Sequence, residues 1–516
     1  MTLWNLYFIF KLCLYGAGHL NPLWMANISF ALALALTSPI RHRALRIARH
    51  IVGLAIGIPL LYHEAKVPPL SRLVETFSAL ESFSLRYWLE ILPRFVPPAL
   101  LALAAVAVAL YFVVNRWLRV ATFVVLALIA WPLWNSIGLA LTPPQVGAGT
   151  GARSTFADAP IDHNAALAAF RTREAQREVT FGHLAADPNA QFDIIVLHIC
   201  SLSWDDLDVS KARDNPMLSH FDYLFSNFSS ASSYSGPAAI RVLRASCGQE
   251  SHADLYKDAP KPCYLLSELA QAGYTPQILF NHDGQFDNFL HIVKENIGVP
   301  GTRIVSNDNA RVAMHAFDGS PVRDDYATLA GWYANRAETP GPVALYYNTI
   351  SLHDGNRLVG NERLTSVESY PQRVNTLMNE IDAFADMVAK SSRRAAIVVV
   401  PEHGAALRGD NDQVAGLREV PSPRIIHGPV GVRLVGLPAD HGTTTVISTP
   451  TSFLALAQLL SNLVSNSPFK PGVALSQYAA GLPETQMVGE NEGTVVMKTA
   501  SGYAVKTPDG IWLEQK

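Results

Sequence analysis

Three segments that lie far apart in the chain carry side chains able to build one metal-activated nucleophile site. Cys200 ends one strand-like apolar run, Glu402 and His403 follow another, and Ser235 stands within Ser-Tyr-Ser-Gly-Pro. One thiolate, one imidazole and one carboxylate form a plausible zinc set, and three protein ligands with an open fourth position are typical of catalytic zinc. The sequence therefore predicts Zn²⁺ at these residues, with Ser235 at the open position. Each of these motifs, taken alone, also occurs by chance. For Cys200, the alternative is a buried, chemically inert cysteine at the end of a strand.

Ser235 is the predicted nucleophile. Gly236 permits a tight turn and Pro237 suits the first turn of a helix, so the Ser235 hydroxyl would lie at the positive helix end, where backbone N–H groups hold phosphate. A zinc ion lowers the pKa of bound water from about 16 to about 7, and we expect a coordinated serine to be activated in the same way. Arg241 and Arg244 could assist phosphate binding, although structural pairing is the commoner role for either.

The segments that carry these residues predict an α/β domain. Near-continuous apolar runs are typical of buried, largely parallel strands, and they cover 192–199, 343–348, 395–400 and 430–437. An apolar stripe over 371–390 predicts one helix, and Thr449 with Pro450 predicts the N-cap and first turn of another. We expect a central sheet covered by helices, with a small antiparallel addition over 494–513.

Ligands gather at the carboxyl ends of strands in such sheets. His353 and Asp354 follow the run at 343–348, just as Cys200 and Glu402 follow theirs. Three strand ends can therefore converge on one cleft, and His353 and Asp354 become candidates for that cleft.

The first ~145 residues predict a membrane anchor of about five spans, because apolar stretches approach the roughly 20 residues that a bilayer core requires. The stretches are 23–40, 95–114 and 120–137, with 3–15 and 51–62 as marginal cases. We interpret the arginine-rich segments 41–49 and 116–119 as loops, and their positive charge indicates that both lie on the cytoplasmic side. The segment 63–94 and everything after residue 142 would then lie outside. The predicted division is a transmembrane anchor over 1–145, a linker over 146–190 and a catalytic domain over 191–516.

Charge and cysteine content fit this division. Residues 1–145 carry a net charge of +7 and the remainder −10, so the exterior domain has no electrostatic footprint for nucleic acid. Cys13 falls in a membrane segment. Three thiols in an oxidising compartment suggest one disulfide and one leftover; Cys247 and Cys263, 16 residues apart, would staple one loop and leave Cys200 free.

The order of these motifs resembles the alkaline phosphatase superfamily, particularly its membrane-anchored phosphoethanolamine transferases. The match sharpens to the cellulose phosphoethanolamine transferases, the G components of bacterial cellulose synthase systems, in the runs 198–204, 233–241, 244–249, 352–356 and 398–404. This resemblance covers most of the chain and implies an inner-membrane protein with a periplasmic catalytic domain that works with cellulose synthase subunits.

The resemblance also implies roles for individual residues. It implies a zinc ion held by Cys200, Glu402 and His403 with Ser235 as nucleophile, a site lined by Tyr234, His353 and Arg418, and a disulfide between Cys247 and Cys263. Tyr234 and Arg418, together with Asp354 from the strand end, are the expected substrate-binding residues. Cys200 stands where an acidic ligand is usual in the wider superfamily, and Glu402 where Asp is usual. A thiolate favours zinc over magnesium or calcium.

The implied reaction moves phosphoethanolamine from phosphatidylethanolamine to glucose 6-hydroxyls of nascent cellulose through a covalent ester on Ser235. His353 is the expected acid and base, because histidine titrates near neutral pH. A phosphoglycerol transferase or phosphodiesterase acting on another envelope glycan is the main alternative, and a non-catalytic scaffold is a further one. A sulfatase is disfavoured because Ala239 stands where its maturation motif places Arg.

Overall fold

The structure is a computed structural model that describes residues 2–16, 20, 22–37, 42–65, 84–95, 98–141, 162–391, 393–410, 413–437, 442–470 and 474–515. It divides into two compact units. The first comprises Met1–Glu81 and Phe95–Ala157, and the second comprises Ser82–Arg94 and Asp158–Lys516. The second unit therefore includes a short piece of the N-terminal region.

Every predicted membrane stretch contains a helix. These helices are α1 (Thr2–Gly16), α2 (Trp24–Leu36), α3 (Arg43–Glu64), α6 (Pro98–Val114) and α7 (Val120–Leu141). Within the described ranges, α3 alone is long and apolar enough to cross a membrane, and α2, α6 and α7 supply shorter apolar segments. The Arg43, Arg46 and Arg49 side chains belong to the first turns of α3, so the prediction that they lie in a loop was wrong.

Lys11 is tolerated within the apolar helix α1 because its charge has partners. It forms a buried ion pair with Glu64 of α3, and its ammonium donates a hydrogen bond to Asn27 of α2 at 2.6 Å. Buried charges are expected to be paired and hydrogen-bonded in this way.

An eight-stranded sheet forms the centre of the second unit, in the order β11-β2-β10-β9-β1-β7-β3-β4. The strands are β1 (Asp193–Ile199), β2 (Tyr223–Ser229), β3 (Thr275–Phe280), β4 (Arg303–Ile304), β7 (Val343–Thr349), β9 (Ala395–Pro401), β10 (His427–Val435) and β11 (Thr445–Ile447). Only β10 runs antiparallel to its neighbours within this sheet. The predicted strands are confirmed, and the sheet is mixed and mostly parallel.

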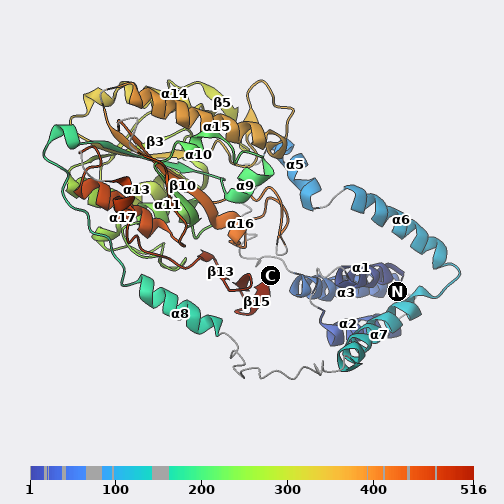
Figure 1. Ribbon diagram of the computed structural model, residues 1–516. Coiled ribbons are helices and arrows are strands. Elements are labelled where there is room, and N and C mark those ends of the chain that lie inside the picture. Colours follow the sequence, from blue (N-terminus) through green and yellow to red (C-terminus); the bar gives the residue numbers. More distant parts are fainter. Residues whose placement is uncertain are drawn as a thin grey trace, which may run out of the picture. The chain divides into compact units, whose positions relative to one another are not determined.

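Helices cover both faces of the sheet (Figure 1). One face packs against α11 (Ser235–Leu243), α12 (Leu265–Ala272), α13 (Phe289–Asn296) and α17 (Phe453–Ser465). The other packs against α9 (Trp204–Val209), α10 (Pro216–Ser219), α14 (Asp325–Ala334) and α15 (Ser366–Ala389). Alternate residues of β1 serve the two faces, since Ile194 and Val196 belong to the first core and Ile195 and Leu197 to the second.

Two helix starts differ from the predictions. Helix α15 begins at Ser366 rather than residue 371, because Thr365 and Glu368 form a capping box. Helix α17 begins at Phe453 after Ser452, so the predicted cap at Thr449 was wrong. The cause is strand pairing: the N–H of Thr451 donates to Asn227 and its carbonyl accepts from Ser229, which keeps this segment extended beside β2.

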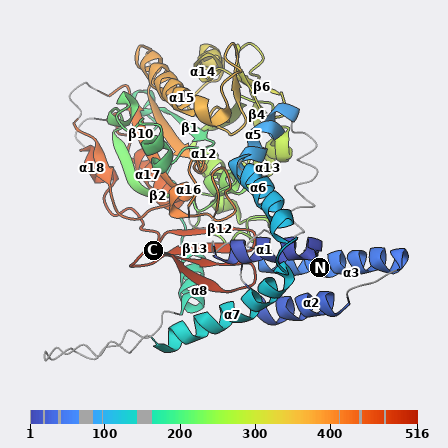
Figure 2. The ribbon, with the colours of Figure 1, turned by 90° about the vertical axis from the view of Figure 1, so that its right-hand side faces the viewer.

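Smaller elements surround the sheet (Figure 2). The predicted antiparallel addition is confirmed as a four-stranded sheet, β12 (Val488–Asn491), β13 (Thr494–Lys498), β14 (Tyr503–Lys506) and β15 (Trp512–Gln515). Helix α8 (His163–Glu174), from the predicted linker, packs Leu167 and Phe170 against it. The other elements in the described ranges are α5 (Leu85–Phe95), α16 (Pro423–Ile426), α18 (Leu475–Tyr478), β5 (Val312–His315), β6 (Pro321–Arg323), β8 (Arg357–Leu358) and 3₁₀ turns at Pro188–Ala190, Lys261–Cys263, Phe286–Asn288 and Arg336–Glu338.

Candidate metal and nucleophile site

The register of β1 and β9 places two predicted ligands side by side. Ile199 pairs with Pro401 at the carboxyl ends of these parallel strands, and the N–H of Glu402 donates to the carbonyl of Ile199 at 2.8 Å. Cys200 and Glu402 are the next residues of their strands, so they leave the sheet together. Ser201 then turns the chain with a φ of 69°, a conformation that non-glycine residues adopt rarely and often at functional sites.

Cys200, Glu402 and His403 form one buried cluster. Their ligand atoms all lie within 4.8 Å of one another, and His403 Nε2 is 3.7 Å from Glu402 Oε2. Among the described residues, neither of these two atoms has a hydrogen-bond partner. Buried polar atoms are rarely left in this state, so a cation bound between them would satisfy both.

The electrostatics of the cluster fit the same interpretation. Burial, reinforced by the charge of Glu402, raises the pKa of the Cys200 thiol to about 12. Burial also raises the pKa of Glu402 and lowers that of His403 well below its usual range. A divalent cation would stabilise the charged thiolate and carboxylate and so offset the cost of burying them. Neutral imidazole is the form of histidine that binds metals. The donor set of sulfur, nitrogen and oxygen suits zinc.

Ser235 lies where the nucleophile was expected. It is the first residue of α11, directly after Tyr234 at the N-cap, and its Oγ is 3.5 Å from Cys200 Sγ. The hydroxyl therefore lies beside the candidate ligands and at the positive end of a helix, where free backbone N–H groups favour an anionic phosphate.

Tyr234 and Arg418 accompany the cluster. The Arg418 guanidinium carbon is 5.7 Å from the centre of the Tyr234 ring, within the range of a cation–π contact. Its Nη1 is 3.3 Å from His403 Nδ1 and donates to Ser201 Oγ at 3.3 Å. Arg418 thus brings a positive charge to the edge of the cluster beside His403.

His353 follows β7, and its Nδ1–H donates to the backbone carbonyl of Asp354 at 2.7 Å. This bond leaves Nε2 as the ring nitrogen that can exchange a proton. Burial and the charge of Arg418 lower the pKa of His353 to about 4, so the ring is neutral near pH 7. The Asp354 carboxylate instead forms an ion pair with Arg94 at 2.7 Å. Its predicted substrate contact stays a prediction.

Two asparagines that support the site were missed in the sequence. Asn348 donates to Glu402 Oε1 at 2.6 Å and accepts from His282 at 2.9 Å. Asn491 of β12 donates to Ser233 Oγ at 2.6 Å and to the Arg418 carbonyl at 3.0 Å. Asn348 carried a usable signal, since it is a polar residue at the carboxyl end of a predicted strand. Asn491 carried none, because only folding brings the C-terminal sheet to this place.

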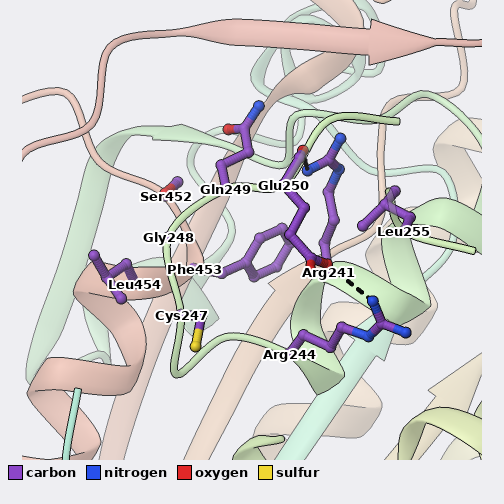
Figure 3. Close-up of a pocket in the computed structure, with 10 residues that line it drawn as sticks. All are labelled: Arg241, Arg244, Cys247, Gly248, Gln249, Glu250, Leu255, Ser452, Phe453 and Leu454. Atoms are coloured by element: carbon purple, nitrogen blue, oxygen red, sulfur yellow. Dashed lines mark hydrogen bonds and ion pairs between the residues drawn. The ribbon is translucent and has the colours of Figure 1, made fainter. Parts of the chain in front are cut away.

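Arg241 and Arg244 have structural partners and lie near Cys247 (Figure 3). Arg241 donates to Ser232 and to the carbonyl of Glu250, and Arg244 pairs with the Glu250 carboxylate at 2.9 Å. Both line a pocket that also contains Cys247. The predicted disulfide between Cys247 and Cys263 is present, with Cα atoms 4.8 Å apart, and Cys200 is a free buried cysteine as predicted.

Comparison with solved structures gives distant matches. A protein in the alkaline phosphatase superfamily from Vibrio parahaemolyticus aligns with 69% of this chain and 91% of its own, at 14% identity and a TM-score of 0.46. The C-terminal periplasmic domain of EcEptC from Escherichia coli, in complex with Zn, aligns with 63% of this chain and 96% of its own, at 13% identity and a TM-score of 0.41.

Comparison with known sequences gives closer matches. Residues 148–512 match the family described as Cellulose biosynthesis protein BcsG C-terminal domain, and residues 4–133 match the corresponding N-terminal domain. The cellulose biosynthesis protein BcsG of Escherichia coli K12 is 36% identical over 544 residues, with 99% of this chain and 95% of that protein covered. The Salmonella typhimurium LT2 protein is 35% identical over 540 residues, with the same coverage. The chain therefore belongs to the BcsG family of cellulose biosynthesis proteins.

Proposed function

We propose that this protein transfers phosphoethanolamine from phosphatidylethanolamine to glucose 6-hydroxyls of nascent cellulose. The observation that carries the proposal is the convergence of Cys200, Glu402 and His403 on the Ser235 hydroxyl at a helix N-terminus. Such a site suits displacement at phosphorus by an activated serine. Membership of a cellulose biosynthesis family supports cellulose as the acceptor and cellulose synthase subunits as partners.

In the first half-reaction, Ser235 Oγ attacks the phosphorus, the bond between phosphorus and the diacylglycerol oxygen breaks, and a phosphoethanolamine ester forms on Ser235. The serine proton passes through His353 to the departing diacylglycerol oxygen. Arg418 and the N–H groups at the start of α11 bind the phosphoryl oxygens.

In the second half-reaction, a glucose 6-hydroxyl attacks the phosphorus and the bond to Ser235 Oγ breaks. His353 takes the proton of that hydroxyl and returns it to Ser235, so protons and bonds balance over the cycle. Cys200, Glu402 and His403 would hold zinc, which supplies Lewis-acid activation of the nucleophile when bound.

The proposed setting is the bacterial inner membrane, with about five spans and the catalytic domain in the periplasm. One observation of the structure supports the sidedness. Helix α5 follows α3 and precedes α6 in the chain, yet it belongs to the same compact unit as the catalytic sheet. Membership of α5 in this unit supports a common side of the membrane for α5 and the C-terminal domain, in agreement with the arginine pattern.

Peptide mass spectrometry of the full chain in phosphatidylethanolamine vesicles tests the proposal. We expect a phosphoethanolamine ester on Ser235 that disappears when a glucan acceptor is added. Vesicles of phosphatidylglycerol serve as the comparison, and an ester formed only from that lipid would identify a phosphoglycerol transferase instead. Absence of any ester from either lipid, in a folded protein that contains zinc, would overturn the mechanism.

A further inference from the structure

Helix α5 comes from the N-terminal region but packs on the catalytic domain. It lies next to the N-terminal end of α15 (Figure 1), where Glu90 accepts a hydrogen bond from the backbone N–H of Ser366 at 2.9 Å. Glu90 is 5% exposed and also forms ion pairs with Arg357 and with Arg94, the latter at 2.8 Å. A buried carboxylate with three partners fixes α5 in one position on the domain.

Arg94, near the end of α5, forms an ion pair with Asp354, the residue after His353. Its two terminal nitrogens bind the two carboxylate oxygens of Asp354 at 2.7 and 3.2 Å. Both side chains are about four-fifths buried, at 17% and 20% exposed, and Tyr87 donates a further hydrogen bond to the same carboxylate at 3.2 Å. A bidentate arginine–carboxylate pair fixes orientation as well as distance.

The Asp354 carbonyl is the group that orients His353, because it accepts the Nδ1–H hydrogen bond. A second connection to His353 runs through two tilted ring contacts. The Tyr87 ring lies 5.7 Å from that of Phe317, which lies 5.4 Å from His353. A Cβ on Gly355 would meet the Tyr87 ring at 2.8 Å, so α5 approaches this turn as closely as glycine allows.

Arg94 also touches the loop that carries Arg418. A Cβ on Gly416 would lie 3.0 Å from Arg94 Nη1, and Gly416 stands two residues before Arg418. The Arg94 side chain therefore lies against two segments, the one that carries His353 and Asp354 and the one that carries Arg418.

We propose that Arg94 is a positioning residue that acts through Asp354 to set the imidazole of His353 against the reacting groups, so that the catalytic centre is complete only with helix α5 in place. This inference rests on the proposed function for its kinetic readout. Arg373 of α15 donates hydrogen bonds to the carbonyls of Ser351 and His353. Tyr87 and Arg94 of α5 hold the Asp354 carboxylate in the same turn. Loss of Arg94 would leave that carboxylate without its cation, and the turn would shift.

The kinetic test combines Arg94→Ala with His353→Ala in the full chain, reconstituted in phosphatidylethanolamine vesicles. We expect Arg94→Ala to slow transfer by up to about 100-fold, as small displacements of catalytic groups do, and Arg94→Lys to restore part of the rate. In the His353→Ala background, Arg94→Ala should have no further effect. Equal slowing in both backgrounds would overturn the proposal and indicate a general structural role. The matched control is Arg86→Ala, since Arg86 is exposed on the same helix and donates a hydrogen bond to the Glu362 carbonyl.

A second measurement needs no substrate. Hydrogen–deuterium exchange in the full chain should rise over residues 350–358 in Arg94→Ala and stay at the wild-type level in Arg86→Ala. Unchanged exchange in Arg94→Ala would overturn the proposal even if the protein proved inactive on phosphatidylethanolamine. Raised exchange in a chain that forms no ester would uphold the positioning contact and reject the proposed function.

Discussion

Asn348 donates a hydrogen bond to Oε1 of Glu402 at 2.6 Å, while Oε2 of the same carboxylate points into the cluster without a partner among the described residues. The two carboxylate oxygens of Glu402 therefore differ in their environment. One is held by the protein and the other remains available to a metal. His282 in turn donates to Asn348, so two consecutive hydrogen bonds connect His282 through Asn348 to the candidate ligand Glu402.

This relationship predicts that Asn348→Ala weakens zinc binding by about 10- to 100-fold, the usual cost of removing a group that orients a ligand. Competition with a chromogenic zinc chelator measures the affinity. Asn227→Ala is a suitable control, since Asn227 is an asparagine of β2, separated from β9 by β10, and its side chain donates to the Ser448 carbonyl. Equal zinc affinities in wild type and Asn348→Ala would show that the hydrogen bond plays no part in the metal site.

The ligand assignment makes a stronger prediction. Cys200→Ser and His403→Ala should each purify with far less zinc than the wild type, because three protein ligands are the minimum of a typical catalytic site. Elemental analysis of the full chain measures the metal content. Undiminished zinc in both variants would remove these residues from the ligand set.

The disulfide predicts a defined loss of stability. Cys247 and Cys263 enclose a loop with a sequence separation of 16, and closing a loop of this length stabilises a protein by roughly 3 kcal/mol. The Cys247→Ser/Cys263→Ser double variant should unfold at a lower denaturant concentration than the wild type, and its free energy of unfolding should be lower by about 3 kcal/mol. Non-reducing peptide mapping of the wild type is the check on connectivity, and a disulfide at Cys200 would contradict both the pairing and the metal site.

The strand ends were predictable from the sequence because long apolar runs leave few choices of register. Cys200 and Glu402 followed such runs, and parallel pairing of β1 with β9 made them neighbours. The contacts of α5 were not predictable, because a short helix between two apolar segments gives no sign of the domain on which it packs. The same holds for Asn491. The antiparallel direction of β10 was missed because a buried strand has the same apolar pattern in either direction.

Asp354 predicts how stability depends on pH. Its burial would raise the pKa, but the hydrogen bond and charge of Arg94 outweigh burial and lower the pKa to about 2, against about 3.9 in an unfolded chain. The pair therefore stabilises the fold above about pH 4 and loses this contribution as the pH falls towards about 2. The difference in unfolding free energy between wild type and Asp354→Asn should be about 2 kcal/mol near neutral pH and should shrink across this window. Denaturant unfolding of the full chain measures it, and a difference that stays constant down to about pH 2 would contradict the ion pair as its source.

Ser235→Ala should abolish transfer while leaving the fold and the zinc content intact. Ser235 is partly exposed at the first position of α11, and the turn keeps Gly236 and Pro237, so removal of the hydroxyl should cost little stability. His353→Ala provides the contrast: it should still form the ester on Ser235 slowly, since loss of a proton donor costs about 10² to 10⁴ in rate while the nucleophile remains. Mass spectrometry should therefore find the ester in His353→Ala after long incubation and never in Ser235→Ala. A folded Ser235→Ala enzyme with normal zinc that modified cellulose at the wild-type rate would exclude the covalent route and require direct attack of the glucose hydroxyl on the lipid.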